Sequence, residues 1–213
     1  MMSCRLDIRM AGLGGQGVVT AAHILGTAVV STGKNAAVNP FFGAEKRLAP
    51  AESYVRISDE PVYDRGEILY PDYIMIFSPD VITMGTSYPM PLYPPLKEKG
   101  LVLINSATAI LSAKEEAGLK KLHARVVYLP ATKLAVEHAG TELATNMTML
   151  GALCGLVDLL DLNAIVTAAE ERFTGKAKIV TSGTTAALDE SFKNKFGKTS
   201  ALIEKNTNAI TEA

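Results

Sequence analysis

A run of glycines near the N-terminus is the first feature of this sequence that could support binding chemistry. Gly12, Gly14 and Gly17 match the pattern G-x-G-x-x-G, and the run also contains Gly15 and Gln16. Glycines permit a tight turn and carry no Cβ atom, so backbone N–H groups can approach a phosphate or another chain closely. The same glycines would also allow a helix to pack closely on a strand without any ligand. The pattern alone leaves both interpretations open.

The residues that follow the glycine run argue against two common phosphate sites. A dinucleotide site needs an acidic residue about 20 residues further on, at the end of the second strand, to bind the ribose hydroxyl. Ala37, Val38 and Asn39 occupy that place, and Glu45 lies beyond it in an expected loop. No Gly-Lys-Ser/Thr sequence follows the glycines, which excludes a Walker-type loop. We therefore do not expect an NAD-dependent dehydrogenase.

A second candidate segment is the loop that we expect to follow the second strand. It contains Phe41, Phe42, Gly43, Glu45 and Arg47. Two adjacent aromatic side chains are costly to expose, and the Arg47 guanidinium offers a planar fork for a carboxylate or phosphate. Because this loop follows the second strand, it should lie at the same sheet edge as the glycine turn. Either it binds a ligand or partner, or it packs on its own core with Glu45 and Arg47 in solvent.

The third candidate segment, Thr145 to Gly151, precedes and opens an apolar run. Thr145 or Asn146 would serve as the N-cap of the helix expected there, and that structural role accounts for both residues. Asn146 is nevertheless kept as a candidate binding residue.

Other catalytic and metal-binding patterns are absent from the sequence. His23, His123 and His138 have no H-x-x-x-H spacing, and neither a G-x-S-x-G nor a CxxC motif occurs. Cys4 and Cys154 are too few for a disulfide framework, and we interpret Cys154 as a buried core thiol in a reducing compartment. We therefore expect no metal site, no iron–sulfur cluster and no catalytic residue in this chain.

The elements that must position these candidates alternate between strand and helix. The expected strands cover 5–11, 36–38, 53–58, 73–77, 101–105 and 125–129, and a loop is expected over 39–50. The expected helices cover 18–31, 79–84, 111–121, 132–139, 147–160, 162–173 and 185–196. This order predicts an α/β, Rossmann-like, doubly wound fold with a mainly parallel sheet and a helical C-terminal third.

We expect a single domain over 1–213, with the sheet core over about 5–130 and the C-terminal helices over about 132–197. The last residues, Ile203 to Ala213, are expected to be frayed or docked on a partner. The net charge of −1 does not favour binding to nucleic acid or to an anionic membrane, and no apolar run is long enough to span a bilayer. Because the N-terminus lacks an apolar h-region, we expect no signal peptide and a cytoplasmic protein.

Four segments, taken in this order, resemble one known family. They are Gly12–Gly17, Phe42–Arg47, Val55–Pro61 and Asn146–Ala152. Together they resemble the gamma subunit of 2-oxoacid:ferredoxin oxidoreductases, the pyruvate/ketoisovalerate oxidoreductase group. The resemblance covers roughly Leu6 to Phe173, and four ordered motifs are far more specific than one glycine turn.

The resemblance implies a subunit of a larger anaerobic enzyme. That enzyme oxidatively decarboxylates a 2-oxoacid to an acyl-CoA, with thiamine diphosphate and 4Fe–4S clusters in thiamine-binding and ferredoxin-like partner subunits. This chain would be a structural, CoA-contacting subunit. The residues expected to bind CoA or a partner are Gly12, Gly14, Gly15, Gln16, Gly17, Phe42, Gly43, Glu45, Arg47 and Asn146. Two alternatives are a free-standing Rossmann-type nucleotide-binding protein and a purely scaffolding subunit.

One departure from the family pattern concerns the residues after Arg47. The family usually has glycine there, whereas this chain continues with Leu48-Ala49-Pro50. Leucine adopts a positive φ only at a cost, so the loop after Arg47 must follow a different path. One interpretation is a branch that acts on aryl or other bulky 2-oxoacids.

Overall fold

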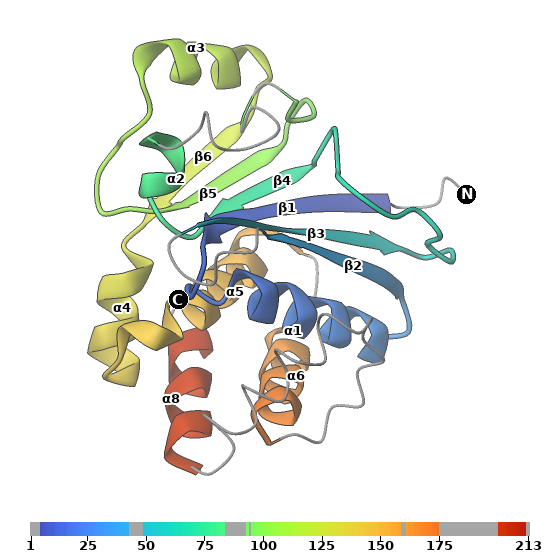
Figure 1. Ribbon diagram of the computed structural model, residues 1–213, viewed down its shortest axis with the longest axis vertical. Coiled ribbons are helices and arrows are strands. Elements are labelled where there is room, and N and C mark those ends of the chain that lie inside the picture. Colours follow the sequence, from blue (N-terminus) through green and yellow to red (C-terminus); the bar gives the residue numbers. More distant parts are fainter. Residues whose placement is uncertain are drawn as a thin grey trace.

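The computed structural model describes residues 5–42, 49–83, 93, 95–158, 161–174 and 200–211. Its centre is a six-stranded sheet with the strand order β2-β3-β1-β4-β5-β6, shown in Figure 1. The strands are β1 (Arg5–Leu13), β2 (Asn35–Phe42), β3 (Pro50–Ser58), β4 (Tyr73–Ile76), β5 (Leu101–Asn105) and β6 (Arg125–Leu129).

The sheet is mainly parallel, with an antiparallel insertion near one edge. β1, β4, β5 and β6 are mutually parallel neighbours, whereas β3 runs antiparallel between β1 and β2. Only residues 43–49 connect β2 to β3, which is too short for the crossover that a parallel pair requires, so the two strands form a hairpin. The α/β class with a mainly parallel sheet is thus confirmed, and the structure adds the position of β3.

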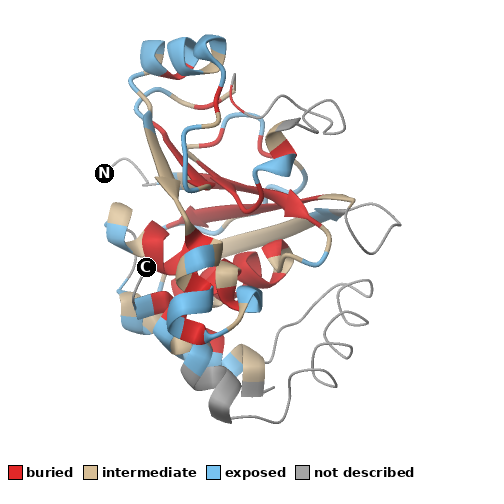
Figure 2. Cartoon of the chain, turned by 90° about the vertical axis from the view of Figure 1, so that its left-hand side faces the viewer, coloured by how far each residue is buried: buried red, intermediate tan, exposed pale blue. Residues whose placement is uncertain are grey.

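Helices cover both faces of the sheet, and buried residues concentrate in the strands and in the helices against them (Figures 1 and 2). The described helices are α1 (Val18–Ser31), α2 (Asp80–Thr83), α3 (Ala113–Lys121), α4 (Ala131–Ala139), the 3-10 helix η2 (Glu142–Ala144), α5 (Thr145–Leu156), α6 (Leu162–Thr174) and α8 (Ser200–Thr211). One apolar cluster joins β1 to α1, α4, α5, α6 and α8. A second joins β4 and β5 to α2 and α3 on the opposite face.

The loop predicted over 39–50 is wrong at both ends. β2 continues through Phe42, and β3 already begins at Pro50, so both phenylalanines belong to a strand. Pro40 indicated a loop, but β2 is an edge strand, where a proline that cannot donate to a ladder is tolerated. Phe41 is half exposed at this edge.

The C-terminal residues pack within the chain, so the prediction of a frayed end is wrong. α8 covers most of this segment, and its Ala209 and Ile210 are buried in the same cluster as α5. The contact is close because Gly151 of α5 has no Cβ: one placed there would lie 2.0 Å from the Ile210 carbonyl oxygen. The helix expected over 185–196 lies outside the described residues. Of the helices that are described, none has the length and apolar character needed to cross a membrane.

Candidate functional site

The glycine turn joins the carboxyl end of β1 to the first residue of α1. Gly15 and Gly17 have φ angles of 97° and 74°, which side-chain-bearing residues rarely adopt. The backbone N–H of Gln16 donates to the Leu13 carbonyl at 3.1 Å. The backbone N–H of Gly14 donates to the Ala49 carbonyl at 2.8 Å. The turn is therefore fixed both within itself and to the residue just before β3.

The glycines of this turn serve different purposes. A Cβ at Gly12 would lie 2.5 Å from Val18 Cγ2, so this glycine allows α1 to begin close to β1. A Cβ at Gly15 would have no atom within 4 Å, and Gly15 lines an open pocket. The Gln16 side chain folds back, and its Oε1 accepts a hydrogen bond from the Leu13 amide at 2.7 Å. Packing thus explains Gly12, whereas the positive φ explains Gly15, beside which the pocket is open.

Asn146 meets this turn from the far end of the sequence. Its Nδ2 donates to the Gly17 carbonyl at 3.3 Å, and its Oδ1 accepts from the Met147 amide at 3.1 Å. A Cβ at Gly17 would lie 2.3 Å from Asn146 Nδ2, so glycine is required here for space as well as for φ. The structure brings together two of the three predicted segments.

The N-cap interpretation of Thr145 and Asn146 is wrong. η2 continues directly into α5, so Thr145 already has helical angles (φ −51°, ψ −40°) and the N-cap is Ala144. Thr145 Oγ1 instead donates to the Glu142 carbonyl at 2.6 Å. Asn146 lies in the first turn of α5, where its side chain is directed at α1.

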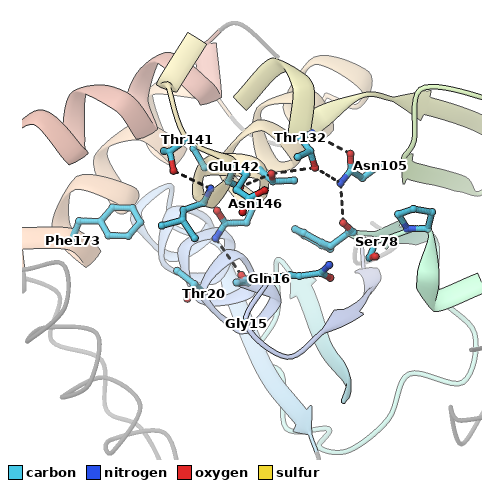
Figure 3. A pocket seen from close by; sticks show the side chains of 16 residues that line it. Gly15, Gln16, Thr20, Ser78, Asn105, Thr132, Thr141, Glu142, Asn146 and Phe173 are labelled. Atoms are coloured by element: carbon cyan, nitrogen blue, oxygen red, sulfur yellow. Dashed lines mark hydrogen bonds between the residues drawn. The ribbon is translucent and has the colours of Figure 1, made fainter. Parts of the chain in front are cut away.

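A pocket of about 360 Å³ opens beside the turn, at the carboxyl ends of β1, β4 and β5 (Figure 3). Its lining residues are Gly15, Gln16, Gly17, Thr20, Phe77, Ser78, Pro79, Asn105, Thr132, Thr141, Glu142, Leu143, Ala144, Thr145, Asn146 and Phe173. Open α/β sheets bind ligands in the crevice outside the strand carboxyl ends, where the connections diverge. Here the divergence lies between β1 and its neighbours β3 and β4.

The pocket offers backbone donors in place of cationic side chains. The N-termini of α1 and α5 both lie in its wall, and neither helix has a side-chain cap or an acidic residue in its first turn. The first turn of α1 leaves its N–H groups unpaired and carries a partial positive charge, which favours an anion. In α5 the Thr145 and Met147 amides already bond to the Glu142 carbonyl and to Asn146 Oδ1, so this helix end adds chiefly its partial positive charge. Glu142, exposed at the rim, is the one charged residue among those that line the pocket.

A polar network joins the strand ends on the other side of the pocket. Asn105 Nδ2 donates to the Phe77 carbonyl and to Thr132 Oγ1, both at 2.9 Å, and Asn105 Oδ1 accepts from the Thr132 amide at 3.2 Å. Thr132 Oγ1 lies 3.3 Å from Thr145 Oγ1, which connects α4 to α5. These residues were not predicted. The available signal was a polar residue at or just after an apolar strand, as at Ser78 and Asn105.

A buried ion pair lies within the sheet, between β1 and β3. Arg9 and Glu52 are 0% and 1% exposed, with Arg9 Nη2 2.5 Å from Glu52 Oε1 and Nε 3.2 Å from Oε2. The Tyr54 hydroxyl also donates to Glu52. Burial, followed by the hydrogen bond to Glu52, raises the pKa of Tyr54 far above its ordinary value. These contacts join side chains of two neighbouring strands, so the group fits a structural role.

The remaining predicted residues have separate outcomes. Phe42 ends β2 opposite Ala51, which also pairs with Gly12, so the second segment starts at the same sheet edge as the glycine turn. Gly43, Glu45 and Arg47 lie outside the described residues, as does Cys4. Cys154 is only partly buried; burial, and then the charge of Asp161, raise its pKa to about 11. In the part of the chain that is described, no group of three or more metal-ligating side chains occurs.

Comparison with known proteins gives a consistent set of relatives. Residues 7–189 match the family described as pyruvate ferredoxin/flavodoxin oxidoreductase. The pyruvate synthase subunit PorC of Methanothermobacter marburgensis is 34% identical over 171 residues, covering 80% of this chain and 88% of the relative. The pyruvate/ketoisovalerate oxidoreductases common subunit gamma of Thermococcus kodakarensis is also 34% identical, over 177 residues with the same coverage.

Solved structures share the fold. Pyruvate oxidoreductase subunit PORC of Thermotoga maritima has a TM-score of 0.64 at 23% identity and covers 98% of this chain and 94% of its own. The 2-oxoglutarate:ferredoxin oxidoreductase of Magnetococcus marinus, with 2-oxoglutarate, coenzyme A and succinyl-CoA bound, has a TM-score of 0.63 at 20% identity. The match covers 94% of this chain and 31% of that one.

Proposed function

Because the chain belongs to the pyruvate ferredoxin/flavodoxin oxidoreductase family, we propose that it works as the gamma subunit of a 2-oxoacid oxidoreductase and contacts coenzyme A. The whole enzyme would oxidatively decarboxylate a 2-oxoacid and release an acyl-CoA. Thiamine diphosphate and the 4Fe–4S clusters would reside in thiamine-binding and ferredoxin-like partner subunits, in the cytoplasm. This chain would supply a binding surface and no catalytic group.

The pocket at the glycine turn is the proposed contact with CoA. The observation that carries this proposal is that the N-termini of α1 and α5 both line one pocket. CoA carries a diphosphate and a further phosphate, which are the anions that helix N-termini bind through backbone N–H groups. At about 360 Å³ the pocket is near the lower limit for small-molecule sites, so it would hold only part of CoA.

On this proposal, the predicted residues have different roles. Gly15 would let the phosphate approach the turn, whereas Gly12 and Gly17 give the turn its shape. Gln16 and Asn146 would hold the turn through the hydrogen bonds that their side chains already make. The segment from Phe42 to Arg47 would extend the binding or partner surface from the same sheet edge.

Native purification followed by CoA binding tests this proposal. We expect the chain to co-purify with a thiamine-binding subunit and a ferredoxin-like subunit. We also expect the complex to bind CoA, and CoA binding to weaken when the pocket is blocked at Gly15. Elution as a free chain near 22.6 kDa would contradict the subunit assignment. An unchanged KM for CoA with weakened assembly after Arg47→Ala would favour the scaffolding alternative, and NAD(P) binding to the isolated chain would favour the nucleotide-binding one.

A further inference from the structure

Thr20 is a buried residue of the pocket wall whose hydroxyl has no partner among the described residues. It lies in the first turn of α1, is 3% exposed, and forms part of the pocket wall (Figure 3). Within the described part of the chain, its Oγ1 makes no hydrogen bond. Helical threonines usually bond to a carbonyl of the preceding turn. Thr148 and Thr211 do so, at 3.4 Å to the Ala144 carbonyl and 3.2 Å to the Thr207 carbonyl.

The other hydroxyl groups that line the pocket all have partners in the protein. Thr132 contacts Asn105, Thr145 donates to the Glu142 carbonyl, Thr141 accepts from the Leu143 amide, and Ser78 contacts Asp80. Thr20 differs from these residues in that its hydroxyl has no hydrogen-bond partner of either kind among the described residues. An isosteric valine would fill the same space without a hydroxyl, so a ligand in the pocket is the partner that would make use of this hydroxyl.

The position of Thr20 indicates what that partner is. Its hydroxyl lies in the same turn as the unpaired N–H groups of α1, and the N-terminus of α5 lines the same pocket. These groups are all donors, and both helix ends carry a partial positive charge. A phosphate oxygen is an acceptor only, and its negative charge fits both ends.

We propose that Thr20 is a ligand-binding residue that donates its hydroxyl hydrogen to a phosphate or diphosphate group held between the N-termini of α1 and α5. The inference rests on the proposed CoA contact, because it assigns the phosphate groups of CoA to this pocket. Asn146 has a different role. Both of its polar atoms already bond within the protein, so it positions the turn instead of binding the phosphate.

The test compares Thr20→Val with Thr20→Ser in the complete oxidoreductase complex. Valine keeps the shape of threonine without the hydroxyl, so the complex should assemble and melt as the wild type does. Thr20→Val should weaken CoA binding by about 10- to 100-fold, the range for a lost hydrogen bond to a charged group. Thr20→Ser should restore binding to within about threefold of the wild type. Pantetheine, which lacks every phosphate, should bind the wild type and both variants equally.

The outcomes separate this inference from the function on which it rests. If Gly15→Val weakens CoA binding and Thr20→Val does not, the role of Thr20 is wrong and the pocket remains the CoA site. If neither substitution changes CoA binding, the pocket is not the CoA site and both proposals fall. If Thr20→Val weakens pantetheine binding as much as CoA binding, the hydroxyl does not contact a phosphate.

Discussion

The side-chain nitrogen of Asn146 lies 3.3 Å from the carbonyl oxygen of Gly17, which joins residues 129 positions apart in the chain. The approach is so close that a Cβ at Gly17 would lie 2.3 Å from that nitrogen. Gly17 precedes α1, and Asn146 lies in the first turn of α5. This contact therefore sets the spacing of the two helix N-termini that line the pocket.

Asn146→Ala should both destabilise the chain and weaken CoA binding. Removing the side chain leaves the buried Met147 amide without its acceptor and takes one of two donors from the Gly17 carbonyl, which keeps the Ala21 amide. The expected cost is about 1–3 kcal/mol in the free energy of unfolding. The freed turn would also bind the phosphate less well, which would raise the KM for CoA. Urea unfolding of the chain and CoA kinetics of the complex measure the two effects.

As a control, Asn163→Ala removes an exposed side-chain amide that bonds to Asp161. The free energy of unfolding should change by less than about 0.5 kcal/mol. Equal unfolding curves for Asn146→Ala and Asn163→Ala would contradict the structural role.

Gly15→Val and Gly33→Val form a matched pair at the two ends of α1. Both glycines have a positive φ, 97° and 85°, and a Cβ at either would have no atom within 4 Å. Each valine should therefore cost a similar backbone strain, about 1–3 kcal/mol. Only Gly15 lines the pocket, so Gly15→Val alone should raise the KM for CoA, by at least about 10-fold, or about 1.4 kcal/mol. The same KM in both variants would show that the turn does not face CoA.

The sequence predicts the position of the pocket, but it does not predict the side-chain contacts that form the pocket wall. The strand–turn–helix order around Gly12–Gly17 is a local pattern, and it correctly places the turn at the carboxyl end of β1. The contact between Gly17 and Asn146 depends on how α5 packs on α1, which no local pattern encodes. Asn105 and Thr132 carry no motif at all, because single polar residues beside strand ends are common. That the Thr20 hydroxyl has no partner can be recognised only from the structure, once the hydrogen bonds of the neighbouring hydroxyl groups are known.

Features that the sequence did not predict, or predicted wrongly, have equally specific causes. The structure buries Arg9 in an ion pair with Glu52, and this pair was not predicted because the sequence does not show that β3 lies beside β1. Pro40 indicated a loop because prolines interrupt central strands, yet the edge position of β2 accommodates it. In both cases the order of strands across the sheet decides the outcome.

Glu52→Leu should be among the most destabilising single substitutions in the sheet. It would remove the Glu52 carboxylate from the fully buried Arg9 guanidinium, a loss of about 3–5 kcal/mol for a buried pair broken on one side. The double variant Arg9→Met/Glu52→Leu removes both charges and should recover most of that loss. Urea unfolding of the wild type and the three variants gives the coupling free energy. A double variant as unstable as the sum of its single variants would refute the pairing.

Cys154 should react slowly with alkylating reagents in the folded chain. Its pKa of about 11, raised from 9.0 chiefly by burial, lowers the reactive thiolate fraction about 100-fold between pH 7 and 8 relative to an unshifted thiol. In a Cys4→Ser background, the iodoacetamide rate should rise about tenfold for each pH unit in this range and should level off only near pH 11. The unfolded chain is the control and should level off about two pH units lower. A folded-state rate that levels off below pH 9 would contradict the raised pKa.

Gly151→Ala tests whether α8 belongs to the packed core. The added Cβ would lie 2.0 Å from the Ile210 carbonyl oxygen, so α5 and α8 must separate, at a cost of about 1–3 kcal/mol. Gly155→Ala is the matched control on the same helix, where a Cβ has no atom within 4 Å. Because alanine is the better helix former, that control should gain up to about 1 kcal/mol. Amide hydrogen exchange should quicken across α8 in Gly151→Ala and stay unchanged in Gly155→Ala. If exchange in α8 is the same in both variants, α8 is not held against α5 by this contact.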